Sequence, residues 1–355
     1  MRKRLVPALA LTLLAVACND APGNSLATVT DSNSPNDPES GQGRALEAGR
    51  VLIGKAAPAA DLRTIDGQSI DLAEAYGRKP VYLKFWATWC IPCRQQMPGF
   101  ESDFQEYRDR ILTIAVNTGF NDSEDAIRQY RLRHGLSMPI AIDDGSLGEA
   151  LNLRVTPQHV VIGRSGRVLY VGHEEDAGLR DALERAIAEP PSSVPVARHV
   201  QRKGYKVGDM LNHVDPSLEK AAGFELSGSS LDGKARVLMF FSPWCESYLK
   251  ESRPKQAAAC SRVRNQVNQL AKSGGPRFVG ISSGLWSSAK DLADYRASKG
   301  LVIPVHLDAD GRLFRSFGVQ EVPTLIVIDA TGRVARRIGP TDEDLNVALR
   351  AASAG

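Results

Sequence analysis

The sequence predicts an α/β protein built from two successive domains of one fold, each a mixed central sheet flanked by helices. Apolar runs of strand length alternate with amphipathic runs of helix length, and the same landmarks recur in the same order in both halves. A segment rich in proline separates the halves. The length of 355 residues, of which 43% are hydrophobic and 24% charged, fits two or three soluble domains.

The first half is expected to follow the order strand, helix, strand, helix, strand, strand, helix. We expect these elements at residues 81–85, 90–108, 111–116, 123–134, 159–162, 168–171 and 177–188. The helix at 123–134 carries a start signal, because Ser123 precedes acidic residues that favour the positive end of a helix dipole. This order implies a mixed sheet with helices on its faces.

The second half repeats the landmarks of the first. Residues 85–90, Phe-Trp-Ala-Thr-Trp-Cys, correspond to residues 240–245, Phe-Phe-Ser-Pro-Trp-Cys. Residues 155–162, which contain Thr-Pro, correspond to residues 322–328, which begin with Val-Pro, and each half closes with a hairpin signal that contains glycine. Because several landmarks keep one order, the chain is predicted to carry two copies of one domain.

The N-terminus is predicted to be an export signal. Three basic residues, Arg2 to Arg4, precede an apolar run at residues 5–17 that is too short to span a bilayer as a helix. The run ends Leu-Ala-Val-Ala-Cys, which resembles a bacterial lipobox, so Cys18 is expected to carry lipid and to have no redox role. Plain signal-peptide cleavage is the alternative. The mature chain is exported in both cases, and several acyl chains would anchor it to a membrane.

Composition sets the expected domain boundaries. Residues 1–18 are the lipoprotein signal peptide, and residues 19–50, rich in Ser, Asn, Asp, Pro and Gly, form a flexible tether. The first domain is expected over residues 51–188, a proline-rich linker over 189–204 and the second domain over 205–355. The formal net charge is +3 and no sustained basic block follows the signal peptide, which argues against a nucleic-acid partner.

Two cysteines three positions apart, Cys90 and Cys93, form the clearest chemical motif. They lie where an apolar strand gives way to an amphipathic helix. Unpaired N–H groups and the helix dipole stabilise a thiolate there, so the pKa of Cys90 is expected to lie below that of a free thiol. Cys93, one helical turn on, can form a disulfide with Cys90 and displace a partner held as a mixed disulfide. The motif predicts thiol–disulfide exchange.

Metal binding is the rival interpretation of Cys90 and Cys93. A structural zinc site needs about four ligands, usually a second cysteine pair or two closely spaced histidines, and the sequence has neither. We therefore expect no resident metal. Two thiolates alone could hold Cu(I), which prefers soft ligands, so a copper-handling role stays open as an alternative.

The first half resembles the thioredoxin fold, and more closely the exported TlpA-like disulfide reductases. The resemblance covers about residues 51–188 and rests on Gly54, Pro58, Asp66-Gly67, the motif at 85–93, Pro98 and Thr156-Pro157. It implies that the Thr156-Pro157 bond is cis and faces the cysteines across a groove where a substrate strand pairs, with Trp89 shielding the thiol. It also implies protein disulfide or dithiol substrates, no bound cofactor, and a membrane thiol protein as electron donor.

The first site departs from this family at two positions. Lys84 stands where thioredoxins have a buried acid, and Gln96 stands where exported relatives often have a glutamate. If Lys84 is buried beside the sulfurs, it would favour the thiolate and make the couple more oxidising; if its ammonium reaches solvent, it would matter little. Both residues are candidates for redox tuning, while His159 is expected to pack or to face solvent.

The second half resembles the same fold with an altered site. It retains Cys245 at a predicted helix start and Val322-Pro323 as the cis-proline signature, but Tyr248 replaces the second cysteine. Cys260 would lie roughly 22 Å from Cys245 along an unbroken helix. If Pro254 breaks this helix and the chain folds back, a Cys245–Cys260 disulfide can form. The alternative is a degenerate domain that serves as a docking or dimerisation surface.

Together these patterns predict an exported thiol–disulfide oxidoreductase, anchored by lipid in the periplasm, that reduces protein disulfides. Cys90 would attack the substrate disulfide and Cys93 would resolve the mixed disulfide. A disulfide oxidase or isomerase is the alternative within the same class. Outside it, the alternatives are a copper-handling or a protein-binding module.

Overall fold

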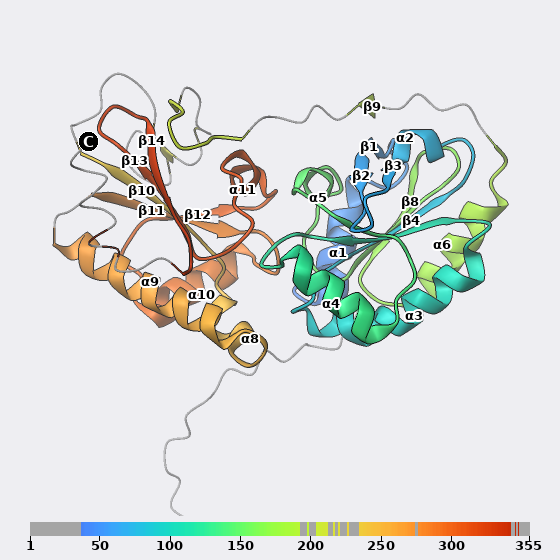
Figure 1. Cartoon of the computed structure of the whole chain (residues 1–355), viewed down its shortest axis with the longest axis horizontal. Helices are drawn as coiled ribbons and strands as arrows, with labels where there is room; N and C mark the ends of the chain where they lie inside the picture. Colours follow the sequence, from blue (N-terminus) through green and yellow to red (C-terminus); the bar gives the residue numbers. More distant parts are fainter. Residues whose placement is uncertain are drawn as a thin grey trace, which may run out of the picture.

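The structure is a computed structural model that describes residues 37–191, 197–198, 204–211 and 234–341 without 274–275, together with a few isolated positions. The expected signal peptide with Cys18, and residues 19–36 of the expected tether, lie outside the described residues. Two five-stranded sheets dominate the described part of the chain (Figure 1). They are the two mixed sheets that the alternation of elements predicts.

The first sheet has the strand order β6-β5-β4-β7-β8. Its strands are β4 (Val81–Trp86), β5 (Leu112–Asn117), β6 (Ile140–Ile142), β7 (Gln158–Ile162) and β8 (Val168–Gly172). β4, β5 and β6 run parallel, whereas β7 pairs antiparallel with both β4 and β8. The short edge strand β6 was not predicted, because three residues are too few to show a period.

Helices cover both faces of this sheet. Every residue of β4 is therefore buried, and its apolar side chains alternate between two hydrophobic clusters, one on each face. Tyr82 and Trp86 join the cluster that includes α3, α4 and α6. Leu83 and Phe85 join the cluster under α2 and α5. The helices of the first domain are α1 (Gly41–Arg50), α2 (Leu72–Ala75), α3 (Ile91–Tyr107), α4 (Glu124–His134), α5 (Ser146–Ala150) and α6 (Ala177–Ala188).

The start signals read from the sequence agree with the observed caps. Ser123 is the N-cap of α4 and its side chain accepts the N–H of Ala126 at 3.2 Å, while Gly135 ends the helix in a left-handed conformation. α6 begins and ends at the predicted residues. α3 runs unbroken through Pro98, which lies inside the helix.

The expected tether is wrong for residues 41–50, which form the helix α1. Ser40 caps it by accepting the N–H of Gly43 at 3.0 Å, and Ala45 and Ala48 are buried. α1 lies so close to β8 that a Cβ on Gly49 would stand 2.9 Å from Val171. Leu46, the one large apolar residue of this segment, is 44% exposed, and the face toward β8 is made of small residues, as this close contact needs. The composition therefore looks like that of a linker.

Three short strands complete the first domain. β2 (Asp61–Arg63) and β3 (Ser69–Asp71) form a hairpin, and β1 (Pro58–Ala59) pairs in parallel with β9 (Ala197–Arg198). β9 lies within the segment expected to be a linker. That segment therefore includes at least one stretch paired to the first domain.

The second sheet repeats the first, with the order β12-β11-β10-β13-β14. Its strands are β10 (Arg236–Phe241), β11 (Arg277–Ser283), β12 (Val305–Asp308), β13 (Thr324–Ile328) and β14 (Val334–Ile338). The described helices of this domain are α8 (Cys245–Ser252), α9 (Pro254–Lys272), α10 (Ala289–Lys299) and α11 (Arg312–Ser316). Parallel and antiparallel pairings match those of the first sheet strand for strand, which confirms two copies of one fold.

The two domains pack against each other. One hydrophobic cluster runs from the first domain into the second and includes Trp89, Phe120, Trp244 and Phe314. Figure 1 shows the short helices α5 and α11 facing each other between the two sheets. The domain contact is therefore part of the largest apolar core in the described chain.

Candidate functional site: a dithiol facing a cis proline

The cysteines of the first domain form a disulfide at the start of α3. Cys90 is the N-cap of this helix, and its Sγ is bonded to that of Cys93, with the Cα atoms 5.2 Å apart. The backbone N–H of Cys93 donates to the Cys90 Sγ at 3.2 Å. Such an N–H at a helix start is the donor that would stabilise a thiolate on Cys90 after reduction. The predicted strand-to-helix position of Cys90 is confirmed.

A cis proline borders this disulfide. The Thr156–Pro157 bond is cis, as the resemblance implied, and the Val322–Pro323 bond of the second domain is cis as well. The carbonyl oxygen of Thr156 lies 3.2 Å from the Cys90 Sγ. His173, which follows β8, donates from Nδ1 to the Pro157 carbonyl oxygen at 2.7 Å. The backbone around the proline is thus held next to the sulfur that is expected to attack.

A chain of hydrogen bonds connects the dithiol helix to β4 and β7. Gln96 donates to the His173 carbonyl oxygen at 3.0 Å, and its Oε1 lies 2.9 Å from His159 Nε2, which must therefore be the donor. His159 Nδ1 then accepts from the Tyr82 hydroxyl at 2.8 Å. Burial and the nearby Lys84 hold the pKa of His159 well below its usual value, so this imidazole is neutral. His159 packs in the core; the alternative that it faces solvent is wrong.

Lys84 is fully buried and ion-paired. Its side chain is 0% exposed, and its Nζ lies 3.0 Å from Oε1 of Glu175. The alternative in which the ammonium reaches solvent is therefore excluded. Glu175 approaches α3 at Gly99, where an added Cβ would stand 2.6 Å from its Oε2. An acid is thus present after all, supplied by the segment after β8 rather than by β4.

Burial lowers the pKa of Lys84 to about 8, against the partly compensating charge of Glu175. Below pH 8 both the folded and the unfolded chain hold this proton, so the burial penalty is fully present. Between pH 8 and 10.5 the unfolded chain keeps the proton while the folded chain loses it, so rising pH stabilises the fold. The free energy of unfolding should therefore rise by about 3 kcal/mol relative to Lys84→Met across this window.

Urea unfolding of the full chain at pH 7, 8, 9 and 10, followed by tryptophan fluorescence, measures this difference. The comparison with Lys84→Met removes the contributions of the other titrating groups, because the two proteins share them. Parallel stability curves for the two proteins would contradict the assignment of a neutralisable lysine at this position.

The altered site of the second domain is also closed by a disulfide. Pro254 begins α9 after a break at Arg253, and the chain folds back so that Cys245 and Cys260 are bonded with their Cα atoms 6.4 Å apart. The disulfide that the sequence left open is therefore present. Cys245 is 0% and Cys260 7% exposed, so the bond lies inside the domain.

Tyr248, at the position of the missing cysteine, points instead at the first domain. Its hydroxyl accepts the N–H of Ile91, the residue after Cys90, at 2.9 Å. The Trp89 ring, expected to shield the thiol, stacks on Trp244 with ring centroids 5.1 Å apart. Cys90 is only 1% exposed. The second domain thus lies over the dithiol of the first.

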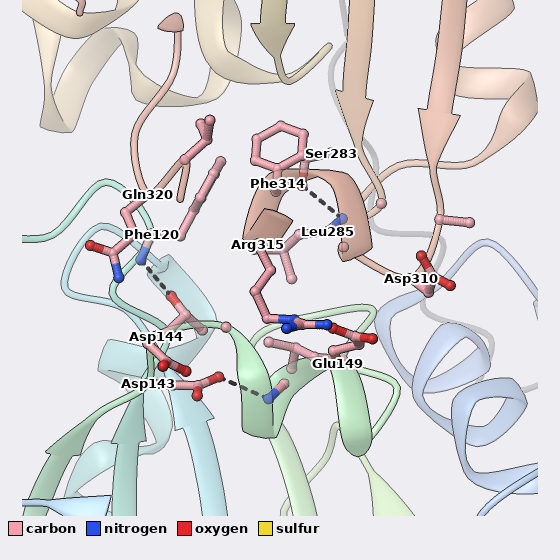
Figure 2. A pocket seen from close by; sticks show the side chains of 18 residues that line it. Phe120, Asp143, Asp144, Glu149, Ser283, Leu285, Asp310, Phe314, Arg315 and Gln320 are labelled. Atoms are coloured by element: carbon pink, nitrogen blue, oxygen red, sulfur yellow. Dashed lines mark hydrogen bonds and ion pairs between the residues drawn. The ribbon is translucent and has the colours of Figure 1, made fainter. Parts of the chain in front are cut away.

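A small cavity lies between the domains beside this contact. It has a volume of about 100 Å³, well below the roughly 300–1,000 Å³ of typical small-molecule sites. Figure 2 shows Arg315 of α11 reaching toward Glu149 of α5, with which it forms an ion pair. Asp143 accepts the N–H groups of Leu147 and Gly148, and burial raises its pKa to about 6. The Arg315–Glu149 pair joins the two domains, and the small cavity leaves little room for a ligand.

Sequence reasoning missed several residues at this site. Glu175 and His173 are far from the cysteines in sequence and carry no local signal. Asp122, which precedes the helix-start residue Ser123, accepts the N–H of Thr88 at 2.7 Å and pairs with Arg253 of the second domain. The available signal for this contact was Thr88, a polar residue immediately before Trp89 in the motif.

A cysteine pair at a helix start, next to a cis proline, defines a thiol–disulfide oxidoreductase. Residues 53–171 match the AhpC/TSA family model, and residues 233–334 match a model described as thioredoxin-like. Thioredoxin-like protein YneN of Bacillus subtilis is 37% identical over 125 residues, which are 34% of this chain and 73% of that protein. The chain belongs to the thioredoxin-like family.

Two further proteins are similar to parts of the chain. Thiol-disulfide oxidoreductase ResA of Halalkalibacterium halodurans is 38% identical over 112 residues, which are 31% of this chain and 62% of that protein. A solved thiol:disulfide interchange protein of the thioredoxin family from Chlorobium tepidum TLS has 26% identity and a TM-score of 0.33, over 38% of this chain and 97% of that one. The matched part thus spans less than two thirds of the ResA from this organism.

Two features are absent from the described residues. Within them, no helix combines the length and the apolar character needed to cross a membrane. The same residues contain no group of three or more His, Cys, Asp or Glu side chains placed to share a metal ion.

Proposed function

We propose that this chain is an exported reductase of protein disulfides that works through a Cys90/Cys93 dithiol cycle. The observation that carries the proposal is the Cys90–Cys93 pair at the start of α3, with Cys90 Sγ 3.2 Å from the carbonyl before the cis proline. An extended substrate segment can pair with that backbone and present its own disulfide to Cys90. The relatives named thiol-disulfide oxidoreductase support the same chemistry.

The cycle transfers two electrons to the substrate. The Cys90 thiolate attacks one sulfur of the substrate disulfide, forming a mixed disulfide and releasing the other substrate sulfur as a thiolate. Cys93 then loses its proton and attacks the Cys90 sulfur, which forms the Cys90–Cys93 bond and releases the second substrate thiolate. Both released thiolates take up protons. A membrane thiol protein is the proposed donor that reduces Cys90–Cys93 again.

The surroundings of the dithiol bear on the direction of electron flow. Lys84 pairs with Glu175, and this pair is nearly neutral overall, so it favours the thiolate less than an unpaired ammonium would. Gln96 is uncharged and binds His159 and the His173 carbonyl. We therefore assign Lys84 and Gln96 positioning and tuning roles, and we favour the reductase direction over an oxidase or isomerase.

Export and anchoring rest on the N-terminal sequence. The basic start, the apolar run and the cysteine at position 18 support a lipoprotein signal and a periplasmic location. Lipid on Cys18 would hold the chain at a membrane, close to a membrane thiol donor.

Replacing Cys93 by alanine tests the proposed cycle. Because nothing resolves the first intermediate, partners should accumulate as disulfide adducts of Cys90. Cells producing Cys93→Ala would be quenched with acid and alkylated, and adducts would be separated without reductant and identified by mass spectrometry. The Cys90→Ser/Cys93→Ala variant is the matched control and should trap nothing. Failure of Cys93→Ala to retain any partner would contradict the proposed function.

A further inference from the structure

One residue of the second domain lies against the backbone next to Cys90. Trp286 follows β11, and its backbone N–H donates to the carbonyl oxygen of Arg154 at 2.8 Å. Its indole Nε1 lies 3.3 Å from Thr156 Oγ1, and its ring meets His173 edge to face with centroids 5.4 Å apart. A substrate strand would use the same backbone just before the cis proline. Trp286 therefore stands where a substrate residue would bind.

The start of α8 closes the other side of the dithiol. The Trp244 ring stacks on Trp89, and the Tyr248 hydroxyl binds the N–H of Ile91. Trp89 and Ile91, which make these contacts, are the residues on either side of Cys90 in the sequence. Since Cys90 is 1% exposed, a protein disulfide cannot reach its sulfur while the domains keep this arrangement.

The contact is reciprocal, which shows that it is built into both domains. Asn121 and Trp286 hold equivalent positions and have nearly equal φ angles of 56° and 55°. Asn121 donates its N–H to the Gln320 carbonyl at 2.7 Å and accepts the N–H of Val322 at 2.9 Å. Arg154 and Gln320 are equivalent as well, because each lies three residues before the cis proline of its own domain. Each domain thus places the same loop against the segment that precedes the cis proline of the other.

Ion pairs hold the domains in this arrangement. Arg253 pairs with Asp122, whose carboxylate is 0% exposed, and Arg315 pairs with Glu149 (Figure 2). Arg44 of α1 adds a third pair, 2.8 Å from Asp291 of α10. Because their partners are partly or fully buried, these pairs should matter more than pairs on an open surface.

We propose that the second domain is a substrate-mimicking cover of the dithiol site, and that the domains must separate before Cys90 can react with a protein disulfide. This inference rests on the proposed function of the Cys90/Cys93 pair. The rate of disulfide exchange then equals the rate at an uncovered Cys90 multiplied by the fraction of molecules in which the domains are separated. Changes that weaken the contact should raise the rate, although they lie outside the catalytic domain.

Alkylation of the reduced full-length chain tests the cover. Iodoacetamide serves as the small probe and a polyethylene glycol maleimide of about 5 kDa as the large one, with labelling of Cys90 read by peptide mapping. The ratio of large-probe to small-probe rates reports access and cancels changes in thiol pKa. We expect this ratio to rise roughly tenfold or more in Arg253→Ala/Arg315→Ala and in Trp286→Ala. Arg312→Ala, which loses only the exposed pair with Asp310, should match the wild type.

Reduction of insulin disulfides by the same proteins separates this inference from the proposed function. Opened variants should reduce insulin faster than the wild type by the factor seen in alkylation. A wild type that labels and reduces as fast as both opened variants overturns the cover while leaving the oxidoreductase function in place. If the opened variants label faster but no protein reduces insulin, the cover is supported and the proposed function is overturned.

Discussion

Replacing Cys245 and Cys260 by alanine is expected to destabilise the second domain by about 3 kcal/mol, the loop-closure value for a bond that spans 15 residues. The bond fastens α8 to α9 across the break at Arg253. The double variant is preferred to a single one, because a lone buried cysteine could pair wrongly with Cys90 or Cys93. The expected loss is a large fraction of the usual 5–15 kcal/mol stability of a domain.

Hydrogen exchange of the full chain, read by mass spectrometry on peptides from α8, α9 and β10, measures this effect domain by domain. A loss of about 3 kcal/mol corresponds to roughly a hundredfold faster exchange where exchange requires opening of the domain. Cys90→Ala/Cys93→Ala is the matched control and should leave these peptides unchanged. Unchanged exchange in the Cys245→Ala/Cys260→Ala protein would show that the bond does not stabilise the domain.

The second large effect concerns Cys90. Cys90→Ser should reduce disulfide exchange to the uncatalysed rate, because a hydroxyl at a helix start stays protonated and is a poor nucleophile toward sulfur. Cys93→Ser should also stop turnover, but for another reason: the first attack still occurs, and the mixed disulfide then persists. The two variants therefore lose the same activity and differ in whether an adduct forms.

Much of the fold and the dithiol could be predicted from local sequence. The start of α4 at Ser123 and the Cys90–Cys93 pair depend on residues that are neighbours in the chain. The break at Pro254 was visible for the same reason, since proline cannot continue a helix beyond its first turn. Short-range physics decides these features, so one sequence is enough to find them.

The charge environment of the dithiol could not be predicted in the same way. Lys84 and Glu175 are 91 residues apart, and their pairing depends on β8 lying beside β7 and on a glycine in α3 that leaves space. The sequence motif showed a missing acid, whereas the fold brings one from another segment. α1 was misjudged for a related reason, because small residues signal flexibility until a close contact is known.

The contact between the domains was the least predictable feature. Tyr248 marked the second site as degenerate, but only the structure places its hydroxyl on the N–H of Ile91. Trp286 stood outside every motif. Its importance comes from the arrangement of two folded domains, which pairs residues about 130 positions apart. The second domain thus lacks one cysteine of the pair, and the tyrosine in its place contacts the first domain.

The most direct test of the account is the rate of insulin disulfide reduction driven by dithiothreitol, measured side by side for four full-length proteins. The wild type and Cys245→Ala/Cys260→Ala should accelerate the reaction, the latter at least as strongly, because its Cys90/Cys93 pair is intact and its cover is loosened. Cys90→Ser should run at the uncatalysed rate, whereas Cys93→Ser should run far below the wild type, because dithiothreitol must then release each mixed disulfide in place of Cys93. Activity in Cys90→Ser equal to that of the wild type would contradict the assignment of the dithiol as the site of chemistry.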